Sequence, residues 1–356
     1  MAVQTGAQVP QTRFHRDVVL SSGLHYQTWS PEGSPAIGEV SVPLALVYPV
    51  SRRLSLDLVT GSGSASLGEG AGSLSGLTDT KVRASYILGD EAALVTVGIS
   101  APTGKTGLTQ EEQAVSSALA QGALNFRAPN FGQGLDVSLG LAVARQVGET
   151  VLGVGAGYLR KGEFTPSAGG AAYAPGSELS LTAGVDRRLR GGDGKLTVDA
   201  VYTLYGKDQQ DGATVFAPGS KLLVQGLLAL RGRGLEWRVH ATGRLRGASE
   251  RSQSGTTARI TNGGQFEVGA SLLKEVSPRW ALRGVASAKA YADNVSELGA
   301  LRVEQGEATI LSAGPGVRLH LGTGRFLDIT ARYGTGKMDG ASTSGIDVGT
   351  AVWLRL

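Results

Sequence analysis

The sequence contains no cysteine, which excludes a disulfide framework and any metal or redox site built on thiolates. No stretch approaches the roughly 18 consecutive apolar residues of a membrane-spanning helix. The formal net charge is only +4 and is evenly spread, which argues against a nucleic-acid partner. The first residues have no apolar signal-peptide core, which leaves either a cytoplasmic protein or a mature chain that begins with a replacement Met1.

Glycine, by contrast, is abundant, with 54 of 356 residues against an ordinary share of about 7%. Hydrophobic residues still make up 41% of the chain, so it is not disordered, and glycine does not recur at every third position as in collagen. Glycine inside strands permits curvature and close approach of neighbouring strands. We therefore interpret most of the glycines as structural.

Most apolar stretches alternate with a period of two, which is the pattern of β-strands with two different faces. At the end of the chain, one face carries Ile346, Val348, Thr350, Val352, Leu354 and Leu356, and the other carries Asp347, Gly349, Ala351, Trp353 and Arg355. The stretch 235–246 alternates in the same way, with Leu235 and Val239 on its apolar face. The sequence therefore predicts an all-β protein.

Alternation alone fits both a soluble sandwich, in which the apolar face is the core, and a membrane barrel, in which that face meets lipid. The connections separate the two, because short and long links alternate along the chain. The short links are 49–53, 89–92, 146–150, 190–194, 232–234, 276–279 and 322–325, and the long ones lie near 30–36, 61–76, 102–133, 162–175, 207–219, 248–262, 293–307 and 338–343. This order predicts a transmembrane antiparallel up-and-down β-barrel of about 16 strands, with about 14 or 18 left open, short periplasmic turns and long external loops.

One motif imitates a nucleotide-binding loop. Gly104, Lys105 and Thr106 follow an expected strand, but five residues separate Gly98 from Gly104 where a phosphate-binding loop has four. The four histidines are scattered, and no Ser/His/Asp combination can be assembled. We therefore expect no enzyme, no catalytic residue, no metal and no cofactor.

The longest connection, 102–133, has a helix signal of its own. Thr109 and Glu112 fit a capping box at the start of an apolar helical face. Such a loop either folds inward and contacts the solute or packs on its neighbours as a surface lid, and long loops in compact domains are usually functional. The expected constriction and substrate-contacting residues are Ala114, Val115, Ala118, Leu119, Leu124, Phe126 and Phe131.

A second candidate site is a basic wall of the lumen. The strand phase predicts that six basic side chains point inward from four neighbouring strands, opposed there mainly by Glu236 and Glu267. An excess of positive charge on a pore wall favours anionic or polarised solutes, whereas a salt-bridged wall that only stiffens the barrel is the alternative. The six residues are Arg231, Arg238, Arg244, Arg246, Arg283 and Lys289.

Three stretches in the first third of the chain carry a family resemblance. They are the hairpin from Val42 to Leu56, the strand start from Gly76 to Asp79 (GLTD) and the strand end from Pro102 to Lys105 (PTGK). The sequence resembles Gram-negative outer-membrane transporters of the phenol meta-pathway type, which are related to the fatty-acid transporter (FadL-like) barrels. The resemblance implies passive uptake of small hydrophobic or aromatic compounds. Because few residues precede the first strand and no NPA motif is present, an open or loop-gated pore is expected rather than an N-terminal hatch.

The expected organisation is an N-terminal periplasmic extension over 1–16 and a transmembrane β-barrel over 17–356, located in the outer membrane of a Gram-negative bacterium. The expected partners are outer-membrane lipid, lipopolysaccharide and a small-molecule solute, with a monomer, a homo-oligomer and an envelope complex all left open. The expected function is a channel for passive diffusion of small, hydrophobic or aromatic solutes. The alternative is a structural or export barrel of a multiprotein envelope machine, for polysaccharide secretion or motility, without transport of its own.

Overall fold

The computed structural model describes residues 17–68, 70–89, 92–189, 193–253, 255–298 and 301–356. The expected extension 1–16 and parts of the expected turns 89–92 and 190–194 lie outside these residues. The described chain folds into strands and the α-helix α1 (Gln110–Leu119). Within the same residues, no helix has the length and apolar character needed to cross a membrane.

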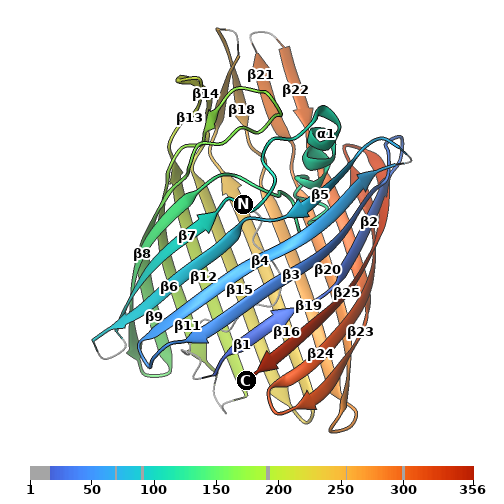
Figure 1. The fold of residues 1–356 in the computed structure, drawn as a ribbon. Helices are drawn as coiled ribbons and strands as arrows, with labels where there is room; N and C mark the ends of the chain where they lie inside the picture. Colours follow the sequence, from blue (N-terminus) through green and yellow to red (C-terminus); the bar gives the residue numbers. More distant parts are fainter. Residues whose placement is uncertain (1–16, 69, 90–91, 190–192, 254, 299–300) are drawn as a thin grey trace.

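The strands form a closed antiparallel barrel of 16 strands, which confirms the predicted fold class (Figure 1). Each strand pairs with its neighbours in the sequence, and β25 closes the barrel by pairing with both β1 and β2. Round the barrel the strands are β1 (Val19–Ser22) with β2 (His25–Pro31), β3 (Ile37–Pro49), β4 (Leu54–Leu67), β5 (Ser73–Leu77) with β6 (Thr80–Leu88), β7 (Ala93–Ala101), β8 (Asp136–Val147), β9 (Thr150–Arg160), β11 (Glu178–Arg188), β12 (Gly194–Tyr205), β15 (Lys221–Gly232), β16 (Leu235–Arg246), β19 (Gln265–Glu275), β20 (Trp280–Tyr291), β23 (Ala308–Gly322), β24 (Arg325–Met338) and β25 (Ala341–Arg355).

Two barrel strands are interrupted. β1 and β2 both pair with β3 and β25, and the strand is interrupted between them at Gly23. A Cβ atom at Gly23 would lie 1.9 Å from the carbonyl oxygen of Thr350. β5 and β6 both pair with β4, and the strand is interrupted between them at Thr78 and Asp79. The second break is where the long loop after β7 is attached.

The connections differ from the expected pattern at two of the long links. The segment 61–76 is mostly strand, because β4 continues to Leu67 and β5 begins at Ser73, and the segment 338–343 is a tight turn between β24 and β25. The first segment is rich in glycine and serine, and the second contains Gly340, Ser342 and Thr343; in a hydropathy pattern such small residues look like a loop. In both hairpins, strand therefore continues to within a few residues of the turn.

Several long loops fold into hairpins of their own and form a second, 7-stranded sheet. This sheet continues the barrel wall upward on one side, at the end opposite the short turns (Figure 1). Its strands are β10 (Tyr173–Ala174), β13 (Asp208–Gln210), β14 (Ala213–Ala217), β17 (Ser249–Gln253), β18 (Thr256–Thr261), β21 (Asn294–Leu298) and β22 (Leu301–Gln305).

The two faces of the barrel differ in polarity as predicted. Leu139, Leu141 and Phe266 lie on the outer face with more than half of their surface exposed, at 55%, 52% and 56%. Charged residues such as Asp57 and Asp328 lie on the inner face, in ion pairs with arginines of adjacent strands. An apolar exterior and a polar lumen are the arrangement of a barrel surrounded by lipid.

Candidate functional site

The loop 102–133 is attached at both ends to Asp79, at the break between β5 and β6. One carboxylate oxygen accepts from the backbone N–H of Gly104 at 3.0 Å, and the other accepts from that of Gln133 at 2.7 Å. The N–H of Asp79 in turn donates to the carbonyl of Phe131 at 3.0 Å. The GLTD and PTGK stretches that carry the family resemblance therefore meet in space, and Gly104 is part of this attachment.

Helix α1 begins with the capping box that the sequence predicts. The N–H of Glu112 donates to the Thr109 hydroxyl at 3.3 Å, and the Glu112 carboxylate accepts from the N–H of Thr109 at 3.0 Å. The Lys105 ammonium also pairs with Glu112, and this hydrogen bond, together with that from Thr109, lowers the pKa of Glu112 below its ordinary value of 4.5. Figure 1 shows the helix at the barrel mouth.

After the helix, the loop lies against the inner face of the barrel. Glu39 of β3 accepts from the N–H groups of Arg127 and Ala128 at 3.1 and 3.0 Å. Gln27 of β2 donates to the carbonyl of Leu124 at 2.6 Å, and Lys289 of β20 donates to that of Ala123 at 3.2 Å.

These wall strands span a broad arc of the barrel, since β23, β24 and β25 lie between β20 and β2. Tyr291, also on β20, donates to the carbonyl of Gly122 at 3.1 Å. The loop is thus held by side chains from both ends of this arc.

An apolar cluster fastens the loop to the wall. It joins loop residues to Trp29, Ile37, Leu74 and Ile310, whose strands are β2, β3, β5 and β23. Of the predicted constriction residues, the structure places these in or against the cluster: Val115, Ala118, Leu119, Leu124, Phe126 and Phe131. Ala114 is exposed instead, because the buried face of the helix is centred on Val115 and Leu119, and Ala114 lies about 100° round the axis from Val115.

Arg127 is the basic residue that the loop brings to this inner face. Its guanidinium forms no ion pair or hydrogen bond with the described residues, although Asp347, Arg332 and Glu39 are close enough to act on it electrostatically. Burial lowers the pKa of the Arg127 guanidinium, but an arginine keeps its charge in proteins. The sequence pattern did not single out Arg127, since a loop has no strand phase from which its direction could be read.

The structure places the predicted basic residues on the inner face of β15, β16 and β20, spread from the short-turn end to the long-loop end. Arg231 and Arg238 share the carboxylate of Glu236, at 2.6 and 2.5 Å. Arg244 donates to the side-chain oxygen of Gln265 at 2.6 Å. Arg246 pairs in register with Lys221, another basic residue, at the long-loop end.

Sequence reasoning missed the partner of Arg283. Asp328 of β24 forms ion pairs with Arg283, at an N–O distance of 3.1 Å, and with Arg318 of β23, at 2.7 Å. One carboxylate is again shared by two guanidinium groups. The signal was present in the sequence, because Arg318 and Asp328 occupy inward positions of strands that alternate like the others. Within the described residues, no group of acidic and histidine side chains is arranged to hold a metal ion.

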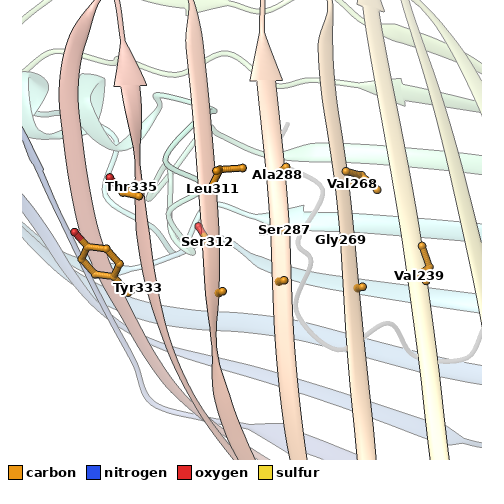
Figure 2. Close-up of a pocket in the computed structure, with 12 residues that line it drawn as sticks. Val239, Val268, Gly269, Ser287, Ala288, Leu311, Ser312, Tyr333 and Thr335 are labelled. Carbon is orange, nitrogen blue, oxygen red and sulfur yellow. The ribbon is translucent and has the colours of Figure 1, made fainter.

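A shallow hollow of about 520 Å³ lies on the outside of the barrel rather than in its lumen. Its rim is formed by Val239, Val268, Leu311 and Tyr333, which Figure 2 shows on strands lying side by side. Alanines between these larger side chains form the floor. The hollow belongs to the apolar outer face, where membrane lipid is the surrounding medium.

No protein-family model matches the chain, and no curated protein matches it. Solved structures are similar to it. OprB of Pseudomonas putida is 11% identical over 96% of this chain and 94% of its own, with a TM-score of 0.52.

Two further barrels are similar at lower TM-scores. The COG4313 outer membrane channel from Pseudomonas putida F1 is 12% identical over 98% of this chain and 100% of its own, with a TM-score of 0.44. The CymD monoaromatic hydrocarbon channel is 14% identical over 96% of this chain and 88% of its own, with a TM-score of 0.45. At such identities the likeness concerns the fold, and the chain has the fold of the bacterial outer-membrane β-barrels.

Proposed function

We propose that the chain is a channel of the bacterial outer membrane, through which small solutes diffuse passively past a constriction set by the loop 102–133. The observation that carries this proposal is the attachment of residues 122–128 to inward-facing side chains of β2, β3 and β20. A loop held there occupies part of the lumen and narrows the path that remains.

The physical basis of transport is a hydrated passage through lipid. A barrel of this strand number encloses a lumen wide enough for water, and the charged side chains of the inner face are suited to polar contents. The apolar outer face contacts outer-membrane lipid and lipopolysaccharide. Passive diffusion needs no catalytic group, so the charged residues act by their fields and hydrogen bonds.

The seven constriction residues predicted from the sequence divide into two roles in this proposal. The six that lie in or against the apolar cluster hold the loop in position, so that their effect on a solute is indirect. The surface that a solute meets is formed by the remaining side chains of the loop and by the basic wall. The resemblance to phenol meta-pathway transporters supports aromatic compounds as solutes to be tested first.

Single-channel recording in planar bilayers tests the constriction. We expect the purified chain to form conducting pores, and we expect deletion of residues 114–126 to raise the conductance, because the segment that narrows the lumen is removed. Heat-modifiable migration in detergent gels establishes that the shortened barrel is folded.

The control is removal of Asp211 and Gly212 from the β13–β14 hairpin, which shortens a loop of the second sheet and should leave the conductance unchanged. If the folded deletion variant conducts like the parent, the loop is not the constriction. If the folded parent does not conduct at all, the channel proposal itself is wrong.

A further inference from the structure

The charged side chains near the docked loop differ in whether they have ion-pair or hydrogen-bond partners. Arg332 forms an ion pair with Asp347 on the neighbouring strand. The Glu39 carboxylate accepts two backbone N–H groups of the loop, and Glu267 lies 3.8 Å from His240. Asp347 and Glu39 therefore each have partners of their own.

Arg127 is the exception at this level. Its backbone N–H is fixed by Glu39, but its guanidinium, with five N–H donors, has no acceptor among the described residues. Arg332 and Lys289 are both close enough for their charges to act on this region. A guanidinium with free donors beside other cations matches the two oxygens of a carboxylate.

The wall below continues the positive charge toward the short-turn end. Two carboxylates, Glu236 and Asp328, are each shared by two arginines, so that each group of three carries a net positive charge. The two groups lie near each other, since Arg238 and Arg283 are close enough for their positive charges to repel. Glu275 is a further carboxylate near this end, and its charge acts on Arg231. An anion that leaves the level of Arg127 therefore meets further cations along the wall.

We propose that the Arg127 guanidinium, presented by the loop beside Arg332, is an anion-binding subsite of the constriction, and that the channel favours small organic anions, carboxylates above all. This inference rests on the proposed channel function and adds the class of solute. Benzoate is the probe that combines a carboxylate with the aromatic ring implied by the family resemblance.

The test measures the reversal potential of the full chain in bilayers across a potassium chloride gradient, and again with potassium benzoate. We expect preference for the anion in both salts. Arg127→Gln should lower the ratio of anion to cation permeability about fivefold, as expected for loss of one charge about 8 Å from ions in a water-filled pore. The loop should remain docked, because the bond to Glu39 uses the backbone of Arg127.

Two further variants are compared with the parent. One tests whether the geometry of the Arg127 side chain matters besides its charge, and the other tests whether loss of any positive charge changes the permeability ratio. Arg127→Lys keeps the charge but loses the planar fork, so the chloride preference should persist while the benzoate preference falls. Arg145→Gln removes a charge from the outer face, where Arg145 pairs in register with the outward-facing Leu152, and should change neither ratio.

The outcomes are distinct for the two proposals. A conducting pore that prefers potassium, or one whose permeability ratio is the same in Arg127→Gln and in the parent, overturns the anion subsite and leaves the channel intact. A folded chain without conductance overturns the channel itself.

Discussion

Glycine serves a specific purpose where a ring lies flat on the inner wall. The indole of Trp29 lies over two neighbouring strands, so that a Cβ atom at Gly334 or at Gly345 would come within 2.5 Å of its ring atoms. In the same way, a Cβ atom at Gly349 would lie 2.3 Å from the imidazole of His25. Glycines on adjacent strands thus let rings lie along the wall, which keeps them from filling the lumen.

This packing predicts that glycines inside long strands differ in how well they tolerate replacement by alanine. Gly334→Ala should destabilise the barrel by about 1–3 kcal/mol, because the Trp29 ring must move out of a packed site. Gly284→Ala is the matched control, since a Cβ atom there meets nothing within 4 Å although it also lies inside a long strand. The measurement is the temperature at which heat-modifiable migration is lost. Equal temperatures for the two variants would contradict the packing role.

At the scale of elements, the start of helix α1 depends on a capping hydrogen bond that can be predicted from the sequence. Thr109→Ala should destabilise α1 by about 1 kcal/mol, because one N–H of the first turn loses its acceptor. Hydrogen exchange of the α1 amides in the folded barrel measures this change. Ser117→Ala is the control, since Ser117 is exposed in the middle of the helix and contributes no cap.

Acid should weaken the same helix end. The pKa of Glu112 is lowered from 4.5, chiefly by the hydrogen bond from Lys105, so ionised Glu112 stabilises the folded loop above its ordinary pKa. That contribution is lost as the pH falls through the lowered value. Exchange of the α1 amides should therefore speed up, beyond the intrinsic effect of pH, as the pH falls below the ordinary carboxyl pKa of 4.5, and a Glu112→Gln variant should show no such additional change.

The same elements indicate how far a sequence can be interpreted on its own. Alternation and capping are local, so the strand faces, the helix start and the inward direction of Arg231 and Arg283 follow from residues a few positions apart. The docking of the loop depends on contacts such as Gln27 with Leu124, across 97 positions, for which a single sequence holds no local signal. The two strand breaks are likewise set by contacts between distant segments, since Gly23 is required by Thr350.

At the scale of the whole molecule, the barrel must close because lipid offers no partner to a free strand edge. Closure is made by β25 with β1 and β2, and it continues past the last strand, where the N–H of Leu356 donates to the carbonyl of Val18 at 2.9 Å. Arg355 also pairs with Asp17. The two ends of the described chain are thereby joined side by side, and no edge of the barrel sheet remains open over this seam.

The surrounding medium can be tested by placing the same charge at two exposed leucines. Leu141 lies in the middle of β8 on the outer face and is 52% exposed, whereas Leu301 lies in β22 of the second sheet and is 61% exposed. If lipid surrounds the barrel, Leu141→Arg should cost about 2–4 kcal/mol of folding free energy, as charges do near the centre of a bilayer. Leu301→Arg should cost little, because water surrounds the second sheet.

The measurement is the midpoint of urea unfolding in lipid vesicles. Equal midpoints would mean that both leucines face the same solvent, and since the described strands leave the apolar face without another protein layer, that result would remove the physical reason for a membrane barrel.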